Sequence, residues 1–147
     1  MRISLFLISL FSVLFCKNSI YTEFGGAGYT KTLNYDRKLS NNFSLRIGYG
    51  FNNTDNNGIL RFYPIEASYL INKLDYAMEA GIGTTFLDGV LEMRGDVIGS
   101  NHKITFIGAG YRKYLYGSNF FVGLKLYFLR LKDESSPWAG LSTGLIF

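Results

Sequence analysis

The last eleven residues of the chain, 137–147, alternate between two faces and end on an aromatic residue. One face is mostly apolar and consists of Ala139, Leu141, Thr143, Leu145 and Phe147. The opposite face consists of Trp138, Gly140, Ser142, Gly144 and Ile146. A strand that crosses a bilayer at a tilt needs about 9–11 residues. The chain end therefore predicts a membrane-spanning strand. This constrains the whole chain, because strands cross membranes as parts of closed barrels.

The same alternation recurs along the chain and divides it into candidate strands. There are eight of them, covering residues 20–27, 29–39, 43–52, 59–71, 74–86, 102–115, 120–131 and 137–147. The boundary between the first two is open. The segment Gly25-Gly26-Ala27-Gly28 fits either a tight turn or a bend within one longer strand.

The links between the candidate strands differ in length. Short polar turns are expected at Asn41-Asn42, Asn72-Lys73 and Gly117-Ser118. Longer links cover residues 53–58, 87–101 and 132–136. Outer-membrane barrels have short periplasmic turns and longer external loops, and an even strand count returns both termini to the periplasmic side. The pattern predicts an all-β fold, an eight-stranded antiparallel up-and-down transmembrane β-barrel.

The two faces of each tract decide between a membrane barrel and a soluble one. The third tract has an apolar face of Phe43, Leu45, Ile47, Tyr49 and Phe51. Its other face consists of Ser44, Arg46, Gly48 and Gly50. A soluble barrel needs a densely charged exterior, whereas single charges among glycines suit a crowded lumen wall. The apolar face is therefore expected to meet lipid. The alternative is a soluble, periplasmic, lipocalin-like ligand-binding barrel, although the Gly-x-Trp of lipocalins is absent near the amino terminus.

The amino terminus has the pattern of an export signal. Arg2 is followed by an apolar run that is too short for a transmembrane helix. We expect residues 1–19 to be a cleaved signal peptide, with cleavage near Cys16, and residues 20–147 to be the barrel domain. Val13-Leu14-Phe15-Cys16 resembles a lipobox, which implies a lipidated Cys16, but Phe15 stands where the motif has a small residue. The other outcome is that Cys16 belongs to the discarded peptide.

Six charged residues fall on the inward face of the expected barrel. They are Glu23, Arg46, Glu66, Glu79, Arg112 and Lys125. Eight strands leave an interior just wide enough for side chains to fill, and buried charges are costly unless they are paired. We expect these acids and bases to pair and to plug the lumen, rather than to line an ion path.

Catalytic, cofactor and metal sites are not expected. Glu66 and Glu79 face inward on neighbouring strands, but without a cleft or a nucleophile they do not predict acid–base catalysis. His102 follows Ser100 and Asn101 at a loop end, where outer-membrane lipid-modifying enzymes place a catalytic histidine. This order lacks the His-x-Ser-Asn motif of the lipid A deacylases. A lipid-modifying enzyme is nevertheless the alternative function, and a metal site would need further ligands.

The distribution of charge bears on binding partners. The net charge of +4 is modest and the basic residues are scattered, so nucleic acid is not an expected partner. The loop 87–101 mixes acidic and apolar residues, and loops on a rigid scaffold commonly carry recognition. It is the expected site for an extracellular partner, unless it extends the strand hairpin beyond the membrane.

The signal peptide, the eight tracts and the terminal Phe147 resemble small bacterial outer-membrane β-barrels of the OmpA/OmpX-like class. The stretches 20–28 and 33–37 also resemble the start of an uncharacterised barrel family. The resemblance implies that Leu141, Leu145 and Phe147 form an assembly signal for the barrel-assembly machinery, although Ser142 stands where glycine is common. It also implies outer-membrane lipid as the surroundings. The expected function is non-enzymatic, either structural or in surface interaction.

Overall fold

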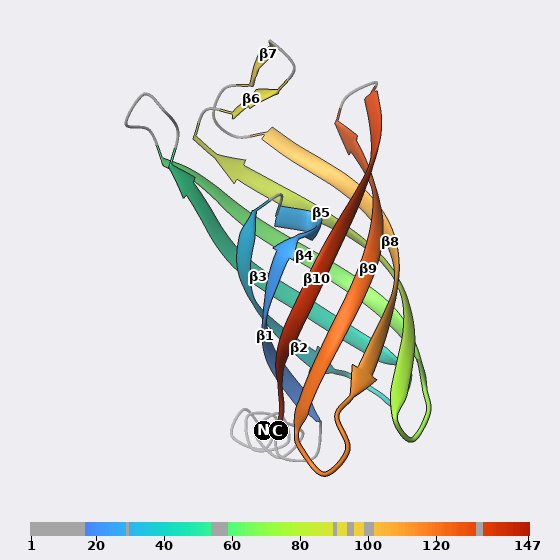
Figure 1. The fold of residues 1–147 in the computed structure, drawn as a ribbon. Coiled ribbons are helices and arrows are strands. Elements are labelled where there is room, and N and C mark those ends of the chain that lie inside the picture. The colour runs from blue at the N-terminus through green and yellow to red at the C-terminus, as the bar shows by residue number, and fades with distance from the viewer. Residues whose placement is uncertain are drawn as a thin grey trace, which may run out of the picture.

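Eight strands of the chain close into a single antiparallel barrel in the computed structural model, which describes residues 17–28, 30–53, 59–89, 91–93, 96–98, 102–131 and 134–147 (Figure 1). Their bounds are β1 Asn18–Gly25, β2 Lys31–Lys38, β3 Phe43–Asn53, β4 Ile59–Asn72, β5 Tyr76–Asp88, β8 His102–Tyr114, β9 Phe120–Leu131 and β10 Glu134–Ile146. The predicted fold class is therefore confirmed. In the described ranges, no helix is long and apolar enough to cross a membrane. The predicted signal segment up to Cys16 lies outside them.

The first and last strands form the seam that closes the barrel. Their antiparallel register runs from Ser19 opposite Ile146 to Gly25 opposite Gly140. Phe147 extends the seam by one residue, because Asn18 N donates to its carbonyl oxygen at 2.7 Å and its own N donates to Asn18 O at 2.9 Å. The chain end with which the sequence analysis began thus leaves the sheet without a free edge.

The two ends of the barrel differ in their connections. The start of β1, the end of β10 and the short connections after β2, β4 and β8 lie at one end, which we call the turn end (Figure 1). The other connections lie at the opposite end, which we call the loop end. Short and longer connections fall at the predicted ends, with one exception in length. The predicted longer link 132–136 is wrong, because β9 continues to Leu131 and β10 begins at Glu134, which pairs with it.

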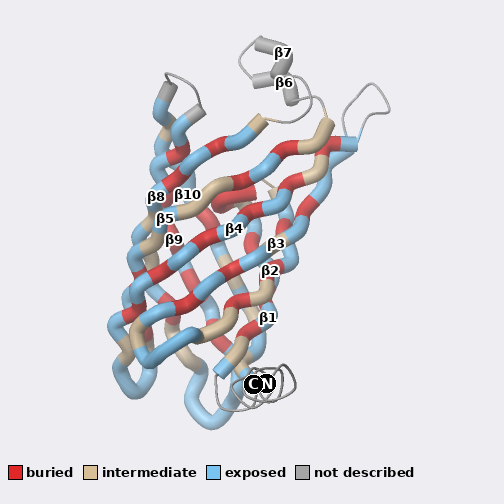
Figure 2. Tube along the Cα trace, turned by 180° about the vertical axis from the view of Figure 1, so that it is seen from behind, coloured by how far each residue is buried: buried red, intermediate tan, exposed pale blue. Residues whose placement is uncertain are grey.

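The apolar faces of the strands point outward. In β3 the exposed large hydrophobic residues are Phe43, Leu45, Ile47, Tyr49 and Phe51. Exposed and buried residues alternate along the strands, as Figure 2 shows. The soluble lipocalin-like alternative is therefore wrong, because such a barrel would bury the apolar ladder and expose the charged face. Trp138, which the alternation assigned to the inner face, is 38% exposed.

The segment after β1 is a tight turn rather than a bend within a longer strand. Gly25 and Gly26 have φ angles of 73° and 70°, which L side chains rarely adopt. The chain then forms a short 3₁₀ helix, η1, over Gly26–Gly28. The expectation that the first strand reaches residue 27 was wrong, since these two glycines end it.

The predicted loop 87–101 is partly regular structure. Strand β5 continues to Asp88, so Leu87 pairs with His102 and is buried inside the barrel. Beyond it, β6 (Leu91–Met93) and β7 (Asp96–Ile98) form a separate two-stranded sheet. Among the described residues, the β5–β8 hairpin is longer than predicted at the end of β5, and the remainder of this loop, residues 90, 94–95 and 99–101, lies outside the described residues.

Candidate functional site in the barrel lumen

The lumen contains all six charged residues that the alternation assigned to it. Each is at most 7% exposed. They come from six different strands: Glu23 from β1, Arg46 from β3, Glu66 from β4, Glu79 from β5, Arg112 from β8 and Lys125 from β9. Because successive strand residues point to opposite faces, each of these charges points into the lumen while its two neighbours along the strand point outward.

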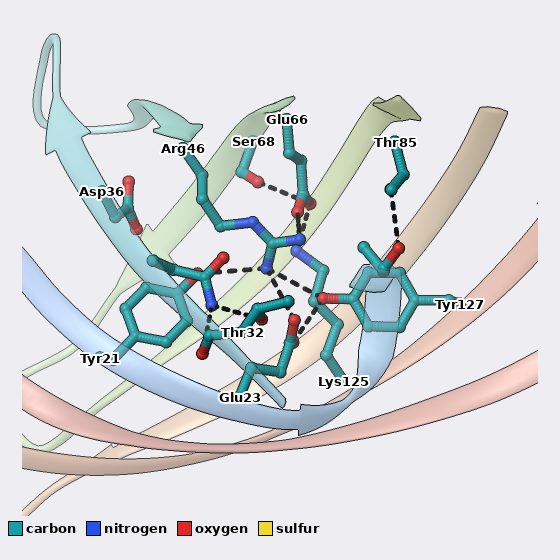
Figure 3. A network of polar contacts seen from close by, with 12 residues as sticks. Tyr21, Glu23, Thr32, Asp36, Arg46, Glu66, Ser68, Thr85, Lys125 and Tyr127 are labelled. Carbon is teal, nitrogen blue, oxygen red and sulfur yellow. Dashed lines mark hydrogen bonds and ion pairs between the residues drawn. The ribbon is translucent and has the colours of Figure 1, made fainter. Parts of the chain in front are cut away.

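Arg46 joins two acids toward the loop end of this group. Its Nη1 lies 3.4 Å from Glu23 Oε2 and its Nη2 lies 2.9 Å from Glu66 Oε2. The same Nη1 donates to the hydroxyls of Tyr21 at 3.1 Å and Tyr127 at 3.0 Å. Tyr127 in turn donates to Glu23 Oε1 at 2.7 Å (Figure 3). The guanidinium fork thus has four partners, which come from three strands: β1, β4 and β9.

Lys125 and Arg112 continue the chain of ion pairs toward the turn end. Lys125 Nζ pairs with Glu66 and lies 2.9 Å from Glu79 Oε1. Arg112 Nη2 lies 2.6 Å from Glu79 Oε2, and its Nη1 lies 2.8 Å from Asp36 Oδ2. One continuous series of ion pairs therefore runs through the lumen, from Glu23 to Asp36.

Asp36 is the member of this series that the sequence analysis missed. It is 3% exposed, on β2. The alternation contained the signal, because Thr32 and Asn34 share its face and both are buried. Asn34 Nδ2 donates to Thr32 Oγ1 at 2.9 Å, so this inner face of β2 is polar throughout.

Aromatic rings surround the cations of the network. The Arg112 guanidinium carbon lies 5.4 Å from the centre of the Tyr21 ring and 5.3 Å from that of Phe121. Arg46 and Lys125 lie 5.9 Å and 5.5 Å from the Tyr127 ring. Cation–π contacts of this length are attractive, and they strengthen when water is excluded. The rings thus fill the space beside the charges and stabilise them.

An apolar layer lies on the loop-end side of the ion pairs. It consists of Ala27, Leu60, Phe62, Leu87, Ile104, Phe106, Tyr127 and Leu129. Ala27 belongs to η1, so the β1–β2 connection folds into the barrel. Thr85 Oγ1 donates to Ala27 O at 2.7 Å and holds it there (Figure 3). Tyr127 belongs to both layers, since its ring packs here and its hydroxyl reaches Glu23.

The other candidate residues lie away from this network. His102 is half-buried at the loop end, and its proposed companions Ser100 and Asn101 lie outside the described residues. Leu141, Leu145 and Phe147 are exposed on the outer face of the seam. Within the described part of the chain, no group of three or more His, Cys, Asp or Glu side chains could hold a metal ion.

The comparisons with known proteins concern the fold. No protein-family model and no curated protein sequence matches the chain. Among solved structures, the N-terminal β-barrel domain of Pseudomonas aeruginosa OprF is similar, with a TM-score of 0.67 and 15% identity over 90% of this chain and 96% of that one. A designed transmembrane β-barrel has a TM-score of 0.57 and 12% identity over 90% and 94% of the two chains. Yersinia pestis outer membrane protein Ail has a TM-score of 0.53 and 14% identity over 90% and 98%.

These similarities and the apolar exterior define the class of the protein. It is a transmembrane eight-stranded β-barrel with the fold of the small OmpA/OmpX-like outer-membrane barrels. At these identities the likeness is one of fold, so any role must come from the chain's own residues.

Proposed function

We propose that the chain is a non-enzymatic barrel of the bacterial outer membrane, with a lumen plugged by side chains and a structural or surface-interaction role through its loop-end segments. The observation that carries the plug is the continuous series of buried ion pairs beneath an apolar layer. In this proposal the turn end faces the periplasm and the loop end faces outward.

The two layers oppose ion passage by different physical means. The apolar layer offers a hydrated ion no polar partners, and desolvating an ion costs many kcal/mol. The ion-pair layer offers partners, but each one is already engaged. Passage through it would leave a buried charge alone, which is strongly unfavourable. A conducting state would therefore require both layers to rearrange together.

Conductance across planar bilayers tests the plug. The folded protein, verified by heat-modifiable migration on a gel, is expected to give no stable single-channel steps. Thr85→Val removes the hydrogen bond that holds η1 but leaves the ion pairs in place, and it is expected to remain closed. Stable conductance by the wild-type barrel would contradict the plug. So would conductance opened by Arg46→Ala or Lys125→Ala without loss of stability.

Cell fractionation tests the location. The protein is expected in the outer-membrane fraction, soluble only after detergent is added. Recovery from the inner membrane would contradict the proposed location while leaving the fold intact. Replacement of His102 by Ala is expected to leave envelope lipids unchanged, and an altered lipid profile would favour the lipid-modifying alternative.

Replacement of the 90–99 segment by a short Gly-Ser linker tests the surface role. Because β5 and β8 pair up to Leu87 and His102, the barrel is expected to fold without this segment. Loss of binding to a surface partner, with barrel stability retained, would support a role for the loop. Full retention of surface binding would assign that role elsewhere.

A further inference from the structure

A polar pocket of about 560 Å³ opens among the connections of the turn end. Three connections contribute to it: the one after β2, the one after β4 and the one after β8. Its wall includes Lys17, Lys38, Lys73, Asn72, Tyr114 and Asn119. Alternation within single strands does not predict this pocket, because its residues come from strand ends and turns that are far apart in the sequence.

Three lysines line the pocket, and none of the other described residues in its wall has a carboxylate side chain. None of the ion pairs among the described residues includes Lys17, Lys38 or Lys73. Residues 1–16, which precede this wall, contain no Asp or Glu. The pocket therefore carries an excess of positive charge.

The acids closest in sequence to these lysines already have cationic partners. Asp75 pairs with Lys113, whose hydrogen bond holds the pKa of Asp75 below its usual value. Asp36, deeper in the barrel, lies 2.8 Å from Arg112. The terminal carboxylate of Phe147 follows Ile146 in the pocket wall, yet it forms no ion pair with a described residue. Neither acid side chain is free to neutralise the pocket lysines.

Asn72 fixes the position of one of the three ammonium groups. Lys38 Nζ donates to Asn72 Oδ1 at 3.1 Å, and Tyr114 OH donates to the same oxygen at 3.4 Å. Asn72 is itself held, because its Nδ2 donates to Asn41 O at 2.7 Å. An ammonium has three donors, so Lys38 keeps two for a ligand. It is thus positioned before any ligand arrives.

The pocket ends before the ion-pair network. The next cavity inward has a volume of about 10 Å³ and is lined by Asp36 and Arg112, among others. A space of this size holds about one water molecule. A ligand in the pocket would therefore stop there and would not enter the lumen.

We propose that this pocket binds a phosphate group, either from a soluble phosphate ester or from a phospholipid headgroup. A phosphate monoester carries up to two negative charges and three acceptor oxygens, whereas the phosphodiester of a lipid headgroup carries one charge. Lysines act toward either as mobile point charges. The ammonium groups of Lys38 and Lys73, which lie within the predicted barrel domain, come from separate segments, match that charge and can approach it from different sides. Lys17 adds a third ammonium group where signal cleavage falls before it. This site goes beyond the proposed function and does not depend on the lumen being closed.

Titration with inorganic phosphate tests the site. The protein, purified from membranes in a zwitterionic detergent, is followed by amide NMR with chloride at matched ionic strength as the reference. Saturable shifts are expected at Asn72, Ser118 and Asn119. Lys38→Gln and Lys73→Gln are each expected to weaken binding by roughly tenfold, which corresponds to about 1.4 kcal/mol.

Lys103→Gln provides the matched control, because Lys103 is an exposed lysine of the loop end. It removes the same charge and is expected to leave phosphate binding unchanged. Equal weakening by Lys103→Gln and Lys38→Gln would overturn the site, because only net charge would then matter. The absence of saturable shifts in the wild-type protein would overturn it as well.

A second arm identifies the source of the phosphate. The barrel in nanodiscs that contain phosphatidylglycerol is examined by native mass spectrometry for retained lipid and by NMR for phosphate binding. Lipid retention that Lys38→Gln removes, together with weakened binding of free phosphate, would support a headgroup ligand. If the barrel in nanodiscs binds free phosphate as strongly as it does in detergent and retains no lipid, a soluble phosphate ester is supported as the ligand.

Discussion

Replacing Arg46 with Ala removes the cation that joins Glu23 to Glu66. The loss is expected to be large, since breaking a buried ion pair by deleting one partner costs about 3–5 kcal/mol. The contacts that remain place the expected value at the lower end. Glu66 still pairs with Lys125 and accepts from Ser68 Oγ at 3.0 Å, and Glu23 still accepts from Tyr127. We expect a loss of about 3 kcal/mol in the free energy of unfolding.

A second substitution separates the charge of Glu23 from the packing of Arg46. Among the described residues, Arg46 is the cation that pairs with Glu23. In the Arg46→Ala protein, Glu23 is therefore left as a buried carboxylate with hydrogen bonds alone. Adding Glu23→Gln removes this charge and is expected to recover roughly 1–2 kcal/mol, within the usual range of coupling between contacting residues.

Urea unfolding of the barrel in lipid vesicles measures both changes in the free energy of unfolding. If the slope of this free energy against urea concentration is unchanged, the same folded and unfolded states are being compared. Arg61→Ala is the matched control. Arg61 lies 3.2 Å from Asp88, but the two side chains are 43% and 50% exposed, so this pair is expected to contribute little. The reasoning is refuted if Arg46→Ala destabilises the barrel no more than Arg61→Ala does.

Three further substitutions test other parts of the fold. Tyr127→Phe removes a buried donor to Glu23 and is expected to cost about 1–3 kcal/mol in the same unfolding assay. Gly26→Ala is expected to reduce stability by more than 1 kcal/mol, because its Cβ would overlap the carboxyl group of Glu23 at a φ of 70°. Phe147→Ala is expected to lower the yield of heat-modifiable barrel in cells. Refolding of purified Phe147→Ala into vesicles should be affected less, and an equal loss in both would indicate a structural role.

The strands were predictable because their signal is local. In β3, residues two positions apart point to the same side of the sheet. The outward apolar residues and the inward position of Arg46 therefore follow from the sequence alone. Part of the pairing is also local. Arg46 and Glu66 stand directly opposite each other in the β3–β4 register. β3 and β4 are consecutive strands of known alternation, and pairing with the next strand along the chain suffices to bring such residues together.

The rest of the network depends on which strands face each other across the lumen. Asp36 stands opposite Arg46 in the β2–β3 register, yet its ion pair is with Arg112 of β8. The inward fold of η1 depends likewise on Thr85, which is 58 residues from Ala27. Such contacts require the barrel to be closed, and alternation within one strand contains no information about them.

The glycines of the lumen wall connect the local pattern to the closed network. A Cβ at Gly81 would overlap Glu66 Oε1 and lie 2.6 Å from Ser68 Oγ. A Cβ at Gly110 would lie 3.0 Å from the Cβ and Cγ atoms of Lys125. Both glycines therefore leave room for a charged side chain of a neighbouring strand. In an interior that side chains fill, Glu66 and Lys125 each need such a small residue on the neighbouring strand. The mixture of single charges and glycines that distinguished the inner face in the sequence is thus a packing requirement of the ion pairs.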